Sequence, residues 1–173
     1  MESHKEQFTF FWHGPFSQWH GCRFRIDGVI YNCAEQYMMA QKAVLFKDED
    51  ALAKIMATDS PRIQKGLGRK VRGFDQSKWN SRAREIVYRG NWAKFTQNDD
   101  LQELLLATKG TTIVEASPSD SIWGIGLGED DPRAWDRKTW RGKNWLGEVL
   151  TRVRDDILKA KDTVGAPAGG VTD

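Results

Sequence analysis

The sequence is poor in the residues that build metal clusters and disulfide frameworks. Its 173 residues include only two cysteines, Cys22 and Cys33, and three histidines that all fall within the first 20 residues. Two cysteines cannot form a cysteine-based metal cluster, and they argue against a disulfide scaffold. The histidines match no ligand spacing, so we expect neither a metal nor an organic cofactor.

Long apolar runs and a strong net charge are also absent. No stretch approaches the roughly 20 apolar residues that cross a bilayer, and residues 1–7 contain no apolar signal-peptide core. We therefore expect an intracellular protein, cytoplasmic or nuclear, without membrane contact. The net charge of +2 is too small for a dedicated DNA-binding protein, although it is compatible with a local basic site for phosphates.

The size and composition predict one soluble globular domain. With 39% hydrophobic and 29% charged residues, the chain can bury a core without covalent staples. We predict that the domain covers residues 8–160, between flexible tails at 1–7 and 161–173. Nothing in the sequence indicates an obligate protein partner, so we expect a monomer.

The residue pattern predicts a mainly helical α+β fold with a small antiparallel sheet near the N-terminus. Strand formers at 8–12 precede a hairpin signal, in which Asp27-Gly28 joins 22–26 to 29–31. Helix signals then dominate, with Asn32, Ser60 and Ser77 as the expected N-caps. We expect helices near 34–46, from 48 onward, near 61–68, 77–95, 101–108 and 144–159, and a strand at 112–115 that could rejoin the early sheet.

Eight tryptophans are the compositional outlier, and several lie beside glycine or charge rather than in apolar runs. Trp19 lies in a predicted loop at 14–21, and Trp123 lies in a long predicted loop at 117–142. A long loop inside a compact domain is usually functional or disordered, and its tryptophans argue against disorder. We expect these two indoles to stack on a flat ligand.

Glu35 and Lys42 are seven residues apart in the helix predicted at 34–46. Seven residues fall only about 20° short of two turns, so both side chains point the same way, about 10 Å apart along the axis. Met38 and Met39 between them would bury both charges and shift their pKa values. The positive end of the helix dipole would favour the ionised form of Glu35.

A structural interpretation of the same two residues stays open. Asn32 and Glu35 fit the capping-box spacing, in which the carboxylate only satisfies a backbone donor. Lys42 could likewise be a solvated lysine near the helix C-terminus, where the dipole favours a cation.

Two glycine-rich segments are candidate ligand contacts. Gly66-Leu-Gly68-Arg69-Lys70 could cradle a phosphate, or it could be a helix C-cap followed by basic surface. The glycines after Trp123 neither follow a predicted strand nor precede a predicted helix, which excludes a dinucleotide-binding motif. Close approach of this backbone to a ligand remains possible. An acid, an amine, cations and aromatic loops together favour hydrolysis of a glycosidic bond in a nucleotide-sugar.

Several segments match the motifs of one protein family in order and spacing. They are Phe16-Ser17-Gln18-Trp19, Ala34-Glu35-Gln36-Tyr37-Met38-Met39-Ala40-Gln41-Lys42, Gly66-Leu67-Gly68-Arg69, Trp79, Trp92-Ala93-Lys94-Phe95, Leu104-Leu105-Leu106-Ala107-Thr108, Trp123-Gly124 and Gly142-Lys143-Asn144-Trp145-Leu146-Gly147. Over residues 8–158 the chain thus resembles the NADAR family, also called YbiA-like.

The resemblance implies an N-glycosidase that cleaves ribosyl N-glycosidic bonds. Some members resemble enzymes that remove ADP-ribose from guanine in nucleotides or nucleic acid, and others resemble enzymes that discard ribosylaminopyrimidine intermediates of the riboflavin pathway. A non-catalytic module that binds ADP-ribose or NAD is a further alternative. We favour an ADP-ribosylated guanine nucleotide or nucleic acid as the substrate.

Carried over by motif, the resemblance implies a set of site residues. Glu35 would be the catalytic carboxylate, and Lys42 would be an amine that attacks the anomeric carbon of the ribose to give a Schiff base. The implied substrate-binding residues are Phe16, Ser17, Gln18, Trp19, Arg69, Trp79, Trp123, Gly124, Asp130, Asp131 and Asn144.

Two positions depart from the family pattern. Some members carry an acid two places after the tryptophan that corresponds to Trp123, where this chain has Ile125. If that acid is needed, Asp130, Asp131 or Asp136 must replace it. The family's Phe-Ser-Asn-Phe also reads Phe16-Ser17-Gln18-Trp19 here, which affects the substrate more than the reaction.

Overall fold

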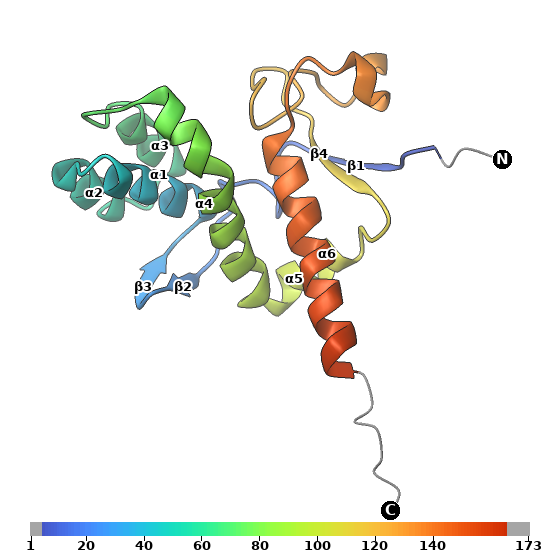
Figure 1. Ribbon diagram of the computed structural model, residues 1–173, viewed down its shortest axis with the longest axis horizontal. Coiled ribbons are helices and arrows are strands. Elements are labelled where there is room, and N and C mark those ends of the chain that lie inside the picture. The colour runs from blue at the N-terminus through green and yellow to red at the C-terminus, as the bar shows by residue number, and fades with distance from the viewer. Residues whose placement is uncertain (1–4, 166–173) are drawn as a thin grey trace, which may run out of the picture.

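The computed structural model describes residues 5–165, which form six α-helices and two small sheets (Figure 1). The strands are β1 (Phe8–Phe11), β2 (Phe24–Ile26), β3 (Val29–Tyr31) and β4 (Thr112–Glu115). The helices are α1 (Ala34–Leu45), α2 (Glu49–Met56), α3 (Pro61–Gly68), α4 (Gln76–Thr96), α5 (Asp99–Leu106) and α6 (Trp145–Gly165).

The central helix α4 separates two groups of elements in Figure 1. On one side lie α1, α2 and α3, which pack against one another, and the hairpin of β2 and β3. On the other side lie α6 and the parallel pair of β1 and β4, with α6 packed against both α4 and β4. The mainly helical α+β class that the sequence predicts is therefore confirmed.

The N-terminal hairpin forms as predicted. Strands β2 and β3 pair in antiparallel register, with Phe24 opposite Tyr31. Asp27 and Gly28 both have positive φ angles, 49° and 81°. Positive φ at both central residues is the conformation of the two-residue turn that suits the twist of a hairpin, and aspartate and glycine adopt it more easily than most residues.

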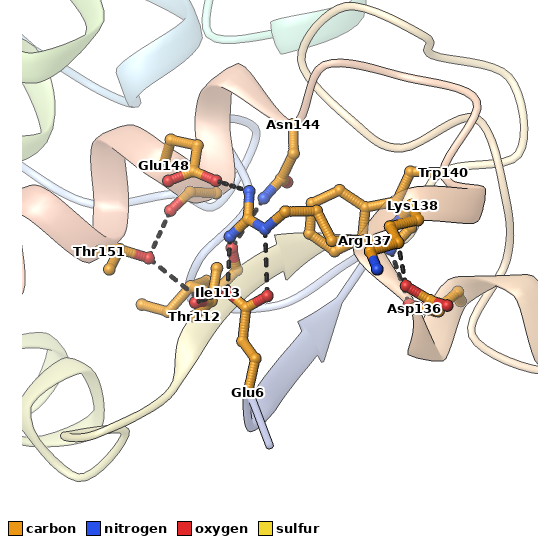
Figure 2. A network of polar contacts seen from close by, with 12 residues as sticks. Glu6, Thr112, Ile113, Asp136, Arg137, Lys138, Trp140, Asn144, Glu148 and Thr151 are labelled. Carbon is orange, nitrogen blue, oxygen red and sulfur yellow. Dashed lines mark hydrogen bonds and ion pairs between the residues drawn. The ribbon is translucent and has the colours of Figure 1, made fainter. Parts of the chain in front are cut away.

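Strand β4 rejoins β1, in parallel register from Phe8 opposite Thr112 to Phe11 opposite Glu115. Within residues 5–165 its other edge meets no strand and is instead hydrogen-bonded by side chains of α6 and of the residue before it (Figure 2). Thr151 Oγ1 accepts from the Ile113 amide at 2.9 Å. Asn144 Nδ2 donates to the Ile113 carbonyl, and Asn144 Oδ1 accepts from the Glu115 amide, both at 3.0 Å.

The close approach of α6 to β4 depends on Gly147. A Cβ at this position would collide with the Ile113 carbonyl oxygen and with the Asn144 side chain. Asn144 itself has a φ of 53°, a left-handed conformation that asparagine adopts more readily than most residues. The segment from Asn144 to Gly147 therefore closes the sheet edge.

The long loop at 117–142 is held by a hydrophobic cluster of its own. Val114, Ile125, Leu127 and Ala134 form this cluster, against which Phe8, Phe10 and Trp140 pack. Two short 3₁₀ turns, Pro132–Trp135 and Arg137–Thr139, lie within the loop. Arg137 forms ion pairs with Glu6 and Glu148, which join the loop to the N-terminal segment and to α6 (Figure 2).

Several element boundaries differ from the sequence prediction. Helix α4 is capped by Asp75 instead of Ser77. Helix α6 continues to Gly165, beyond the predicted end near Lys159, so 161–165 is helical. Residues 5–7 of the predicted N-terminal tail are described, and Glu6 among them pairs with Arg137. Residues 1–4 and 166–173 lie outside the described residues. Within 5–165, none of the helices is both long enough and apolar enough to span a bilayer.

We expect Asn144→Ala to destabilise the fold. The substitution leaves the Ile113 carbonyl and the Glu115 amide without partners in a buried position, which costs about 2–4 kcal/mol of unfolding free energy. Urea denaturation measures the change. As a matched control, Asn80→Ala removes only a solvent-exposed bond from Gln76, with an expected cost of about 0.5 kcal/mol or less. Equal losses in the two variants would contradict the role of Asn144.

Candidate active site

A cleft of about 660 Å³ opens where three elements meet. It lies at the carboxyl ends of β1 and β4 and at the start of α1, since Trp12 and His13 follow β1, Glu115 ends β4 and Glu35 lies in the first turn of α1. Carboxyl ends of parallel strands commonly form ligand sites, and the volume suits a nucleotide-sized ligand.

Residues other than Glu35 cap the start of α1. The predicted N-cap Asn32 is wrong, because Cys33 is the N-cap and its sulfur accepts from the Gln36 amide at 3.4 Å. Gln36 Oε1 in turn accepts from the Asn32 amide at 2.9 Å. The backbone amide of Glu35 donates to the Gln18 carbonyl. The capping interpretation of its carboxylate is therefore excluded.

The carboxyl group of Glu35 is buried against the cleft, and the residue is only 3% exposed. Burial raises its pKa to about 7, and this effect outweighs the opposing attraction of Lys65, Lys42 and Arg69. The expectation that the helix dipole keeps Glu35 ionised thus underestimates the cost of burying the charge. A glutamate in this state can hold or release a proton near neutral pH.

Lys42 lies in the same cleft as Glu35, as the seven-residue spacing predicts. Its Nζ is 4.6 Å from the centre of the Phe74 ring and 5.5 Å from that of Trp79. Burial lowers the pKa of the amine, Glu35 opposes this effect, and Arg69 adds to it. A lysine that is partly desolvated in this way is more readily available as a neutral nucleophile than a solvated one.

The loop at 14–21 supplies three side chains to the cleft, Ser17, Gln18 and Trp19. The amide oxygen of Gln18 accepts from Asn91 Nδ2 at 2.9 Å, while Gln18 Nε2 is buried without a partner. Phe16 does not line the cleft, because its ring packs between Phe11 and Phe95.

A buried lysine on α4 binds the backbone of the loop at 14–21. Lys94 is fully buried, and its Nζ donates to the Ser17 carbonyl at 3.0 Å. Burial lowers its pKa to about 8. The loop that carries Trp19 is therefore attached to the core of the protein by a charged group.

One cation and two indoles from the predicted site residues also line the cleft. Arg69, Trp79 and Trp123 line the cleft, whereas Lys70 does not. The glycines before Arg69 do not form a phosphate cradle, because they lie inside α3 and their amides belong to the helix. A Cβ at Gly68 would collide with the Met39 sulfur, so this glycine serves the packing of α3 on α1.

Other residues predicted to bind substrate lie outside the cleft. Asn144 holds β4, and the Gly124 carbonyl accepts from the Asn144 amide. Asp130 is exposed, and Asp131 caps a 3₁₀ turn and pairs with Arg133. The proposed replacement acid Asp136 also caps such a turn, and Ile125 is fully buried.

Sequence reasoning missed three charged residues of the cleft, Lys65, Glu115 and Asp120. Burial, together with the like charges of Asp120 and Glu35, raises the pKa of Glu115 to about 7. The sequence signal that could have identified Glu115 is its position as a lone carboxylate at the end of a mainly apolar strand. Despite these acids, no three histidine, cysteine, aspartate or glutamate side chains within 5–165 are grouped closely enough for a metal ion.

Comparison with known proteins identifies the family of this chain. A model of the NADAR domain matches residues 8–158. The chain belongs to the NADAR family. Among its relatives, N-glycosidase R617 of Acanthamoeba polyphaga mimivirus is 46% identical over 146 residues, which cover 82% of this chain and 86% of R617. N-glycosidase YbiA of Escherichia coli strain K12 is 30% identical over 149 residues, which cover 86% of this chain and 84% of YbiA.

Two further matches bear on the extent and fold of the NADAR domain. Protein irg-1 of Caenorhabditis elegans is 44% identical over 129 residues, which cover 73% of this chain but only 61% of irg-1. The NMR structure of E. coli YbiA superimposes with a TM-score of 0.74 at 27% sequence identity, over 92% of this chain and 89% of YbiA. The YbiA-like fold predicted from the motifs is therefore confirmed.

We expect Glu35→Gln to change the pH dependence of stability. The raised pKa of Glu35 means that the folded protein binds this proton more tightly than the unfolded chain does. Its contribution to stability is fully present below about pH 4.5 and is lost as the pH rises through about 7, by up to about 3 kcal/mol. The variant should therefore gain stability relative to the wild type over this range.

Urea denaturation at a series of pH values measures this gain. Glu129→Gln provides the matched control, since Glu129 is exposed and lies outside the cleft, and this variant should lack the gain expected of Glu35→Gln. A constant difference for Glu35→Gln would show that Glu35 titrates normally.

Proposed function

We propose that this NADAR protein is an N-glycosidase that releases ADP-ribose from guanine in a nucleotide or nucleic acid. One observation carries the proposal: Glu35, with a pKa raised to about 7, shares a cleft with Lys42 and with Trp19, Trp79 and Trp123. The relatives whose names describe N-glycosidases support the same reaction class.

The chemistry of the cleft suits the substrate in three ways. Indole rings provide flat surfaces for a base, with Trp19 and Trp123 as the stacking groups. Lys65 and Arg69 supply positive charge for the diphosphate. The carboxylate of Glu35 opposes the positive charge that develops on the ribose as the N-glycosidic bond breaks, or activates the attacking group.

Lys42 completes the proposed mechanism. Its amine lies on the same helix face as Glu35 and beside the Trp79 ring, where burial lowers its pKa. The neutral amine attacks the anomeric carbon of the ribose, or supports the covalent step, as the base departs. Water then hydrolyses the product of that step, which releases ADP-ribose and regenerates the amine.

The test is product analysis with ADP-ribosylated guanosine. The wild-type protein should release ADP-ribose and guanosine, and Glu35→Gln should reduce kcat by about 100-fold or more while ADP-ribose still binds. Chromatography measures the products, and calorimetry measures the binding. Glu129→Gln should behave like the wild type, because Glu129 lies outside the cleft.

Two results would contradict the proposal. Undiminished turnover by Glu35→Gln would exclude its catalytic role, and absence of turnover with retained ADP-ribose binding in the wild type would indicate a binding module. Parallel incubation with ribosylaminopyrimidine phosphates separates the two enzyme alternatives, because a protein specific for riboflavin intermediates would cleave only those compounds.

Two adjacent cations provide a matched test of diphosphate binding. Arg69 lines the cleft and Lys70 does not, although both are exposed. We expect Arg69→Ala to raise the KM for an ADP-ribosyl substrate about tenfold or more, because a charge-assisted contact to phosphate is lost. Lys70→Ala should leave the KM within about twofold, since only remote screened charge is lost. Equal effects in steady-state assays would place the diphosphate elsewhere.

A further inference from the structure

Three carboxyl groups line the cleft, and the proposed mechanism uses only Glu35. Of the other two, Asp120 already has a structural role. Its Oδ1 accepts from the backbone amides of Ile122 at 2.9 Å and Trp123 at 2.8 Å, and these bonds shape the turn that presents Trp123. Glu115 has no such role, so its function requires a separate explanation.

Both backbone polar groups of Glu115 are hydrogen-bonded at the edge of β4 that faces away from β1. Its amide donates to Asn144 Oδ1, and its carbonyl accepts from the Ile125 amide, each at 3.0 Å. Side chains alternate along a strand, so Glu115 projects from the same face of β4 as the buried Ile113. The side chain therefore reaches the cleft from a fixed position at the end of the strand.

The surroundings of the Glu115 carboxyl group favour its neutral form. Its Oε2 is shielded from solvent and has no hydrogen-bond partner, which is unfavourable for a charged oxygen. Burial is the main cause that raises its pKa to about 7, Asp120 and Glu35 add to the rise, and Lys65 opposes it. Asp120 and Lys65 act on Glu35 in the same directions, but Lys42 and Arg69 also attract the Glu35 carboxylate.

The two glutamates thus lie in one cleft with different partners. The charged and titratable groups around them are Glu35 and Lys42 on α1, Lys65 on α3, Arg69 directly after α3, Asp120 in the loop after β4 and His13 after β1. More cations act on Glu35 than on Glu115, and the Glu115 Oε2 atom is shielded without a hydrogen-bond partner, so Glu115 is the better placed of the two to carry a proton. Carboxyl pairs whose environments differ in this way commonly divide into an acid and a base.

We propose that Glu115 is the general acid that protonates the departing base. As the bond between the anomeric carbon and the base nitrogen breaks, the bonding electrons stay on that nitrogen, which receives the proton of Glu115. In the hydrolytic step a water molecule supplies hydroxide to the sugar carbon and returns its other proton to the Glu115 carboxylate. This inference rests on the proposed function and adds a second catalytic residue to it.

A comparison of two leaving groups tests the role of Glu115. Guanine needs a proton to depart, whereas ADP-ribose that carries 4-nitrophenol at its anomeric carbon releases a stable nitrophenolate. We expect Glu115→Gln to lower kcat about 100-fold or more on ADP-ribosylated guanosine but only about threefold or less on the nitrophenyl substrate. Glu35→Gln should slow both reactions, because the sugar becomes cationic in each.

The pH profile supplies a second measurement. With the guanosine substrate, wild-type kcat should rise as Glu35 ionises and should fall on the alkaline side of its pH optimum, because Glu115 loses its proton there. Glu115→Gln should lack this decline. Thermal denaturation checks that Glu115→Gln folds. If it does not fold, Glu115→Asp takes its place in the assays, since the shorter acid should impair the guanosine reaction selectively.

The outcomes separate the two proposals. Equal losses on both substrates would show that Glu115 only maintains the structure of the site and would overturn the inference alone. A wild-type protein that cleaves the nitrophenyl compound but not the guanosine substrate would overturn the proposed substrate and, with it, the protonation of guanine by Glu115. The matched control Glu129→Gln should resemble the wild type in every assay, because Glu129 is exposed outside the cleft.

Discussion

The hydrogen bonds between Asn144 and β4 are the interaction on which the site depends. A strand edge without a partner leaves backbone donors and acceptors unsatisfied. Here Thr151 of α6 and Asn144, the residue before α6, bind these groups in place of a third strand. The same bonds fix the end of β4, where Glu115 enters the cleft. Asn144, which the family motif suggested as a substrate contact, therefore lies outside the cleft and holds a strand that lines it.

Burial of charge is the second constraint on the cleft. Glu35, Glu115 and Lys94 are each taken out of water without an ion pair of their own, and each has a pKa shifted toward the neutral form. Such groups reduce stability, and they persist where chemistry needs a proton to move near neutral pH. The rest of the domain supplies the compensating stability through its apolar core.

Local signals in the sequence account for much of the fold and part of the site. The hairpin at Asp27-Gly28 and the facing pair of Glu35 and Lys42 follow from short-range geometry, which sequence spacing encodes directly. Asparagine is usually a better N-cap than cysteine, so the sequence pointed to Asn32 as the N-cap of α1. In the structure Cys33 is the N-cap, because its sulfur accepts from the Gln36 amide while the Gln36 side chain accepts from the Asn32 amide. Glu115 was missed because its role arises from burial and from distant charges, which spacing along the chain does not reveal.

The attachment of Lys94 beneath the loop at 14–21 has a consequence for the evolution of this site. A loop held by a buried ammonium group cannot easily move to accommodate a new ligand, since any displacement would leave that charge without its carbonyl partner. The recognition surface can therefore diversify most readily by exchange of the exposed side chains at the rim. Trp19 projects from this fixed backbone and is 43% exposed, so a single codon change could replace its side chain at little cost in stability.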